Sequence, residues 1–329
     1  ESVHIGELET FIGDYALENI NEKIVQLKEN NKKIAIIGSG PAGLAASYYL
    51  SSRGVKVDIY EKHSKLGGLL RYGIPEFRLD KNILDKSINK IINLGIQVKY
   101  NCELGKDISL EQLKKEYDGI FISVGANIPC FMGIPGEEIK GVFGGNTLLE
   151  HIQTLKENSK PIVPDFNGKK IAIIGGGNVA MDCARVLKKL GASNVKVIYR
   201  RAIEQMPAEK KEIQEAIEDG IEFLFQNNII KIIGKSSVEK IECVKTELVQ
   251  KQGQDRLVPI NVENSNYTID VDNVIMAIGS KPEELMMKLL NLELDKYNYI
   301  VTNDDYKTSD SKVWAGGDII NCKSTVAWA

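Results

Sequence analysis

The stretch KKIAIIGSGPAG, residues 32–43, decides the fold, because its first seven letters return unchanged in KKIAIIGGGNVA, residues 169–180. The two copies start 169 − 32 = 137 residues apart. Each copy joins a short apolar strand, residues 33–37 in the first copy, to a glycine-rich turn, and a stretch that favours a helix follows. A repeated strand–turn–helix unit predicts an α/β fold with two Rossmann-like domains, each built on a parallel sheet.

Both turns have the spacing of a dinucleotide fingerprint. Gly38, Gly40 and Gly43 form GxGxxG, and Gly175, Gly177 and Ala180 form GxGxxA. The first glycine permits the tight turn, the second lets the backbone approach a pyrophosphate, and the third small residue lets the helix pack on its strand. Free N–H groups at the helix start then face the phosphates. The residues between and beside these glycines belong to the same predicted sites: Pro41, Ala42, Asn178 and Val179.

The residues after the second strand of each unit differ in charge. The strand at residues 55–60 is followed by Glu61 and Lys62, whereas the strand at residues 195–199 is followed by Arg200 and Arg201. A carboxylate can hold ribose hydroxyls and repels a 2′-phosphate, which paired guanidinium groups bind well. This predicts FAD at the first site and NADPH, in preference to NADH, at the second. The alternative is that the two arginines are only a solvated strand end.

Further candidate residues follow other predicted strands. The strands at residues 119–124 and 274–278 lead into Gly125 and Gly279, at the strand ends where open α/β sheets place ligands. The segment VWAGGDI, residues 313–319, places Asp318 beside Gly317, and this acid could bind the ribityl hydroxyls of a flavin or simply form an Asx turn. Between residues 229 and 271, short alternating segments predict an antiparallel meander packed on the second Rossmann unit. A helix is expected over residues 206–219, and Asp80 is expected to cap the helix that follows the glycine-rich segment.

Composition excludes several other classes of protein. The chain has 329 residues, 42 Lys and Arg and 45 Asp and Glu, so its net charge is 42 − 45 = −3. Such a balance argues against nucleic acid or an anionic membrane as a partner. No apolar run approaches the roughly 20 residues of a transmembrane helix, and we expect a cytoplasmic protein. The five cysteines form no CxxC pair and the three histidines have no metal-ligand spacing, so a metal centre or a dithiol centre is not expected.

The first 31 residues are expected to form a helical segment. Leu8, Phe11, Ile12 and Tyr15 recur at helical spacing, followed by further apolar residues up to Leu27. This pattern predicts packing on the main body of the protein, with a helix that docks a partner as the less favoured alternative.

The segment GGLLRYGIPEFRLDK, residues 67–81, completes a pattern that resembles a known family. Together with the two fingerprints, the Arg-Arg pair and WAGGDI, it is similar to the small (beta) subunit of NADPH-dependent glutamate synthase. The related modules of dihydropyrimidine dehydrogenase and of the electron-bifurcating NADH-dependent ferredoxin–NADP oxidoreductase share it. The resemblance implies an FAD domain in two pieces, residues 32–145 and 281–329, with an NADPH domain, residues 146–280, inserted between them.

The resemblance also implies site residues and electron transfer. It adds Gly68, Leu69, Arg78 and Leu104 to the FAD site and Ala277 to the NADPH site. Hydride would pass from NADPH to FAD, and electrons would continue through iron–sulfur clusters to the glutamate synthase large subunit or another electron-accepting subunit. No cluster motif occurs in this sequence, so the clusters are expected only on a preceding segment, and the last FAD-contacting helix is expected to be cut off at Ala329.

Four alternatives remain open. The first is a bifurcating or related NAD(P)H:acceptor reductase subunit, because it shares the same module. The second is a disulfide reductase, which would need a thiol pair after Glu61, where none occurs. The third is a flavin monooxygenase, which would need a further signature, and nothing in the sequence suggests one. The fourth is a subunit that holds its cofactors only for assembly, and reduction of the flavin by NADPH would exclude it.

Overall fold

The structure is a computed structural model that describes residues 3, 5–20, 24–157, 164–250, 257–321 and 325–328. The predicted strand at residues 33–37 is formed, as β1 (Lys33–Ile37). The chain divides into two compact units, Glu1–Ala126 with Pro282–Ala329, and Asn127–Lys281. The first unit is thus made of two pieces of the chain, with the second unit inserted between them. The chain passes from the first unit into the second between residues 126 and 127, however, and not between the expected residues 145 and 146.

This difference has a structural reason. Strand β6 (Val142–Gly144), which precedes residue 145, pairs in parallel with β14 (Asn273–Met276) of the second unit. The chain enters and leaves this unit through β5 (Ile128–Pro129) and β15 (Ser280–Lys281), which pair with each other antiparallel. The pairing of these segments therefore assigns residues 127–145 to the inserted unit.

The first unit is built on a five-stranded parallel sheet. Its order is β16-β4-β1-β2-β3, with β2 at Lys56–Tyr60, β3 at Gln97–Lys99, β4 at Gly119–Ile122 and β16 at Val313–Ala315. Side chains alternate between the two faces of β1, so that Ile36 and Ala35 enter different core clusters. The sheet therefore needs cover on both faces.

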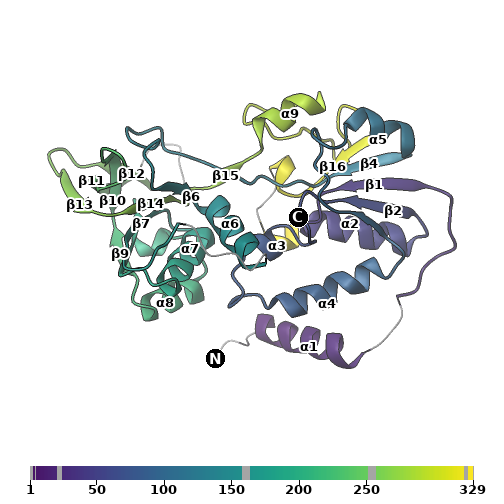
Figure 1. The fold of residues 1–329 in the computed structure, drawn as a ribbon, viewed down its shortest axis with the longest axis horizontal. Helices are drawn as coiled ribbons and strands as arrows, with labels where there is room; N and C mark the ends of the chain where they lie inside the picture. Colours follow the sequence, from purple (N-terminus) through teal and green to yellow (C-terminus); the bar gives the residue numbers. More distant parts are fainter. Residues whose placement is uncertain are drawn as a thin grey trace. The chain divides into compact units, whose positions relative to one another are not determined.

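Helices supply that cover (Figure 1). Helices α2 (Pro41–Ser52) and α4 (Lys81–Ile92) bury Leu44, Leu84 and Ile88 on one face. Helices α5 (Leu110–Glu116) and α9 (Glu284–Leu290) cover the other. The short elements are α3 (Leu69–Tyr72), η2 (Gly317–Ile320) and η3 (Val326–Trp328). As expected, Asp80 caps α4, because its carboxylate accepts the Asn82 N–H at 2.7 Å.

The second unit has three layers. Its central parallel sheet has the order β6-β14-β7-β8-β9, with β7 at Lys170–Ile174, β8 at Asn194–Tyr199 and β9 at Glu222–Phe225. One face packs on α6 (Gly145–Glu157), α7 (Asn178–Lys189) and α8 (Lys210–Glu218). The expected helix at residues 206–219 thus begins only at Lys210, after the short η1 (Ile203–Gln205).

The other face of this sheet packs on the predicted antiparallel meander. Its strands are β10 (Asn227–Ile233), β11 (Lys240–Val249), β12 (Val258–Asn261) and β13 (Tyr267–Asp270). Strand β11 pairs antiparallel with each of the other three. Ile229, Ile232 and Ile241 of the meander share a core with Ala172 and Ile174 of β7, which confirms the predicted packing.

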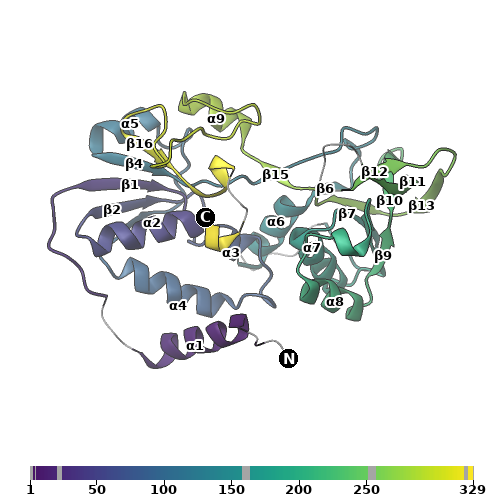
Figure 2. The same ribbon diagram turned by 180° about the vertical axis from the view of Figure 1, so that it is seen from behind.

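The amino-terminal helix is formed and lies beside α4 of the first unit, but it leaves its apolar side chains largely exposed. Helix α1 (Ile5–Asn19) runs beside α4 in both views (Figure 2) and has no buried residue. Phe11 is 68% exposed and Ile12 is 63% exposed. The contact to α4 includes a salt bridge between Lys86 and Glu18 at 3.4 Å. Helical spacing of apolar residues predicted the helix, but it did not predict what would cover its apolar side chains.

Candidate dinucleotide sites

The first glycine turn connects β1 to α2, and each of its glycines meets a different requirement. Gly38 has a φ of +94°, and a Cβ atom there would lie 2.7 Å from the Ser123 carbonyl oxygen. A Cβ atom on Gly43 would lie 2.0 Å from the Gly38 carbonyl oxygen. A Cβ atom on Gly40 would meet nothing within 4 Å. Two glycines thus allow close packing, and the middle one leaves open space beside the backbone, as a bound pyrophosphate requires.

The second turn, between β7 and α7, repeats this geometry. Gly175 has a φ of +138°, and a Cβ atom there would lie 2.2 Å from the Ala277 carbonyl oxygen. At Gly177 the nearest atom would be the Pro207 Cγ, at 3.9 Å. The third position is Ala180, whose methyl group is fully buried. The spacing found in the sequence therefore corresponds to one three-dimensional arrangement formed twice.

Each turn also places a helix amino terminus at the open middle glycine. Gly40 is the N-cap of α2, with Pro41 at the start of the helix, and Gly177 is the N-cap of α7. Neither helix has a side-chain cap that hydrogen-bonds its first N–H groups. Because the first N–H groups of a helix lack carbonyl partners and carry partial positive charge, both termini are suited to bind phosphate.

The carboxylate of Glu61 lies beside the first turn. Glu61 is 3% exposed; its Oε2 accepts the Ser39 N–H at 3.1 Å and the Ser39 hydroxyl, and its Oε1 accepts the His63 N–H at 2.9 Å. A carboxylate has about four acceptor positions, so about one remains for a ribose hydroxyl. Ser39, which joins Glu61 to this turn, was not among the residues predicted from the sequence. The only signal was a polar residue at the variable position of the fingerprint.

Two other predicted segments reach this turn. The Gly67 N–H donates to the Ser39 carbonyl oxygen at 3.2 Å and to its hydroxyl at 3.1 Å. A Cβ atom on Gly68 would lie 2.8 Å from the Gly40 Cα. From the carboxyl-terminal piece, a Cβ atom on Gly317 would lie 2.9 Å from the Ala42 Cβ. The fold thus brings the glycine loop and the Gly317-Asp318 turn to the first fingerprint.

The remaining residues of the first site have varied environments. Leu104 is 6% exposed, and its side chain is part of the core of the first unit. Gly125 has a φ of +73° and lies two residues after Ser123, whose hydroxyl donates to the Gly38 carbonyl at 3.0 Å. Arg78 and Leu69 are half-buried, and Lys62 is exposed. Their roles toward a ligand stay predictions.

The two arginines of the second unit differ in their surroundings. Arg200 is exposed, and its carbonyl oxygen accepts the Thr246 hydroxyl at 2.9 Å. Arg201 is half-buried, and its Nε donates to the Leu257 carbonyl at 3.3 Å. Arg200 therefore presents its guanidinium group to solvent at the end of β8, whereas one nitrogen of Arg201 is engaged by the meander.

The segment after these arginines covers the second turn. The Ala208 N–H donates to the Gly176 carbonyl at 3.1 Å, and the Glu209 N–H donates to the Asn178 Oδ1 at 3.0 Å. The Tyr199 hydroxyl donates to the Gln205 carbonyl at 2.7 Å. Residues 202–209 are thereby fixed beside Gly177, at the end of β8 where Arg200 is exposed. Gly279, also predicted for this site, has a φ of +113° and is exposed.

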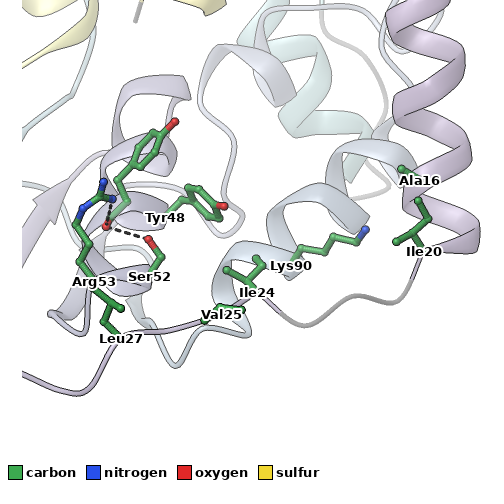
Figure 3. A pocket seen from close by; sticks show the side chains of 10 residues that line it. Ala16, Ile20, Ile24, Val25, Leu27, Tyr48, Ser52, Arg53 and Lys90 are labelled. Carbon is green, nitrogen blue, oxygen red and sulfur yellow. Dashed lines mark hydrogen bonds between the residues drawn. The ribbon is translucent and has the colours of Figure 1, made fainter.

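A cavity of about 710 Å³ lies elsewhere in the first unit (Figure 3). Its lining comes from the last turn of α1 and the chain after it, from the carboxyl end of α2, and from α4: Ala16, Ile20, Ile24, Val25, Leu27, Tyr48, Tyr49, Ser52, Arg53 and Lys90. The first glycine turn is at the opposite end of α2, so this cavity is separate from the fingerprint.

The described residues hold no cluster of three or more His, Cys, Asp or Glu suited to a metal ion. Cys102, Cys130, Cys183 and Cys243 are free thiols, and Cys322 lies outside the described residues. Burial raises the pKa of Cys183 and raises that of Cys243 to about 12. Both thiols are therefore protonated at neutral pH and poorly reactive. No helix in the described part of the chain combines the length and the apolar character needed to span a membrane.

Two dinucleotide turns on parallel sheets, one unit inserted in the other, define a class of flavin- and pyridine nucleotide-linked oxidoreductases. The chain belongs to the pyridine nucleotide-disulphide oxidoreductase family, whose model matches residues 32–328. This match confirms the predicted fold class.

Relatives define the family more closely. The chain is 33% identical to the glutamate synthase [NADPH] small chain of Escherichia coli, over 100% of this chain and 72% of that protein. It is 35% identical to the putative oxidoreductase AegA of the same organism, over 100% of this chain and 52% of AegA. The chain thus spans about half the length of AegA. The resemblance to the glutamate synthase small subunit is confirmed.

Solved structures agree on the fold. The FprA oxidoreductase of Mycobacterium tuberculosis in complex with NADPH superposes with a TM-score of 0.75 at 20% identity, covering 90% of this chain and 81% of FprA. The thioredoxin reductase of Lactococcus lactis gives a TM-score of 0.66 at 20% identity, covering 91% and 94%.

Proposed function

We propose that the first turn binds FAD, that the second binds NADPH, and that the protein transfers hydride from NADPH to FAD. The observation that carries this proposal is the difference at two equivalent positions: a buried carboxylate, Glu61, after β2, and an exposed guanidinium, Arg200, after β8. The first accepts ribose hydroxyls and disfavours a 2′-phosphate. The second supplies charge-assisted hydrogen bonds to that phosphate.

The residues present fit FAD. The open space at Gly40, the amino terminus of α2 and the remaining acceptor position of Glu61 match a pyrophosphate followed by a ribose. Gly68 and Gly317 pack against the same turn, so their backbones would hold the rest of the cofactor. When bound, FAD supplies the redox chemistry, and the protein contributes binding, orientation and electrostatics.

We further propose that electrons leave the flavin through iron–sulfur clusters outside this sequence to a partner subunit. The glutamate synthase small-chain relatives support the large subunit of a glutamate synthase as that partner, with glutamate biosynthesis in the cytoplasm as the setting. Relatives named NADP(+)-dependent formate dehydrogenase subunit beta and NADPH-Fe(3+) oxidoreductase subunit beta support another electron-accepting subunit as the alternative.

An anaerobic titration tests the central step. The FAD-reconstituted protein is titrated with NADPH and then with NADH, while the absorption band of the flavin is followed. We expect bleaching at far lower NADPH than NADH. Flavin that binds but stays oxidised would contradict the proposed hydride transfer and favour a subunit that holds its cofactors for assembly.

A further inference from the structure

A buried arginine lies inside the glycine-rich segment of residues 66–81. Arg71, in α3, is 3% exposed. Its Nε donates to the Leu66 carbonyl oxygen at 2.6 Å, and its Nη2 forms an ion pair with Asp85 of α4. A buried guanidinium is costly unless it is paired and hydrogen-bonded, so these contacts hold the segment in one conformation.

A lysine holds the same segment from its other end. Lys81, the first residue of α4, donates from its Nζ to the Leu70 and Ile74 carbonyl oxygens, both at 2.7 Å. Backbone carbonyls on both sides of Arg71 are thus hydrogen-bonded by basic side chains. Two of the three cations of the GGLLRYGIPEFRLDK segment, Arg71 and Lys81, donate in this way to backbone carbonyls of residues 66–81.

The part of the chain fixed in this way lies against the first glycine turn. Gly67 and Gly68, which follow Leu66 directly, have φ angles of +126° and +51°. The Gly67 N–H donates to Ser39, and Gly68 packs on Gly40. The Leu66 carbonyl that Arg71 holds is therefore adjacent to the backbone that contacts the fingerprint. A shift at Leu66 would move Gly67 away from Ser39 and so disturb the Ser39–Glu61 contact.

We propose that Arg71 is a positioning residue for FAD, which fixes the Gly67–Gly68 backbone against the fingerprint before the cofactor binds. Lys81 supports the same segment. This inference rests on the proposed function, because it assigns the first turn to FAD. Its physical basis is preorganisation: a loop that is already ordered loses less conformational entropy when it receives its ligand.

A direct contact of Arg71 with the FAD pyrophosphate is the competing explanation, and variants separate the two. Arg71→Lys keeps the positive charge, but it lacks the planar guanidinium whose separate nitrogens bind the Leu66 carbonyl and Asp85. Asp85→Asn keeps Arg71 and removes its anionic partner. Positioning predicts that both variants weaken FAD binding. A direct contact predicts that Arg71→Lys retains most of the affinity and that Asp85→Asn retains or improves it.

Two measurements are made on the whole chain for wild type, Arg71→Met, Arg71→Lys and Asp85→Asn. Hydrogen–deuterium exchange of the cofactor-free protein reports the order of residues 62–79, and fluorescence quenching of added FAD gives its Kd. The matched control is Arg53→Met, because the Arg53 Nη1 also donates to a carbonyl, that of Tyr49 at 3.1 Å, but at the far end of α2. If Arg71→Met does not fold, Arg71→Lys and Asp85→Asn carry the comparison.

We expect faster exchange in residues 62–79 of the Arg71 and Asp85 variants, unchanged exchange in the second unit, and a Kd for FAD raised roughly 10- to 100-fold. The control should match wild type in both readouts. Exchange in residues 62–79 like that of wild type, or faster exchange with an unchanged Kd, would overturn the positioning role. Failure of the wild-type protein to bind FAD would refute the proposed function instead, and the exchange data would still decide whether Arg71 orders the loop.

Discussion

Gly43 lies so close to Gly38 that a methyl group on Gly43 would sit 2.0 Å from the Gly38 carbonyl oxygen. The atom in the way is backbone, so it cannot move without shifting the turn itself. We expect Gly43→Ala to lower the free energy of unfolding by about 2 kcal/mol, as overpacked sites do, and to abolish FAD binding. Urea unfolding and FAD titration measure the two effects.

The matched control is Gly40→Ala, because its new methyl group would meet nothing within 4 Å in the cofactor-free protein. We expect this variant to unfold like wild type and to lose FAD affinity, since the methyl group would occupy space that the pyrophosphate needs. Equal loss of stability in both variants would contradict the division of roles between the two glycines.

Removal of the Glu61 carboxylate should affect both cofactor and fold. In Glu61→Ala, the Ser39 and His63 N–H groups lose their acceptor near the first turn. Buried donors without partners cost about 1–3 kcal/mol of stability, and the ribose loses its acceptor. We expect FAD to dissociate during gel filtration, which the ratio of absorbance at 450 nm to that at 280 nm detects. Full flavin occupancy in the variant would disprove the ribose role.

Charge reversal at Arg200 should change the choice of nucleotide. A carboxylate at this exposed position repels the 2′-phosphate, so we expect Arg200→Glu to weaken NADPH binding by about 1–3 kcal/mol and to leave NADH nearly unchanged. The half-reduction points of the anaerobic titrations give both values. The control for charge is Lys231→Glu, at an exposed position of β10. An unchanged preference for NADPH in Arg200→Glu would remove this assignment.

Arg185 connects α7 to α8 through three carboxylates. Its side chain is 9% exposed, with Nε 2.8 Å from Asp219 and Nη1 in contact with Glu212 and Glu215. Because Arg185→Met leaves three acids together without their cation, we expect the free energy of unfolding to fall by about 3 kcal/mol. Lys288→Met, which breaks the exposed pair with Glu284, should have no measurable effect. Equal stabilities of the two variants would refute the structural role of the cluster.

Alkaline pH should destabilise the second unit through Cys243. Burial, and to a smaller extent the nearby Glu242, raises the pKa of this thiol to about 12, whereas an unfolded cysteine titrates near 8.5. The folded state then holds its proton while the unfolded state releases it. The stabilisation is complete below about pH 8.5 and is lost progressively toward pH 12, at up to about 1.4 kcal/mol per pH unit.

The free energy of unfolding, measured with urea at about pH 8, 9.5 and 10.5, should fall between each pair of these pH values. Cys243→Ala should begin less stable and decline less steeply with pH, because it has no thiol to titrate. The same decline in the variant and in wild type would show that Cys243 does not contribute.

Local sequence predicted the elements that local forces determine. Strand β1 was predicted to its residue bounds, and the turns were predicted by glycine spacing, because positive φ angles and the lack of a Cβ atom are properties of single residues. The alternation of short apolar segments likewise predicted the antiparallel meander around β11. The helical period of the first residues predicted α1, although not its exposure.

The sequence by itself therefore determined the two Rossmann units and the two fingerprint turns, and the family resemblance implied the insertion of one unit in the other. Only the tertiary structure decided that Ser39 joins Glu61 to Gly67, that Arg71 holds Leu66, and that Gly317 packs on Ala42. It also decided that β6 pairs with β14, which moved the unit boundary to residues 126/127. Periodicity and spacing describe what each segment does alone, whereas these contacts join segments distant in the chain, and only the packed core fixes which of them meet.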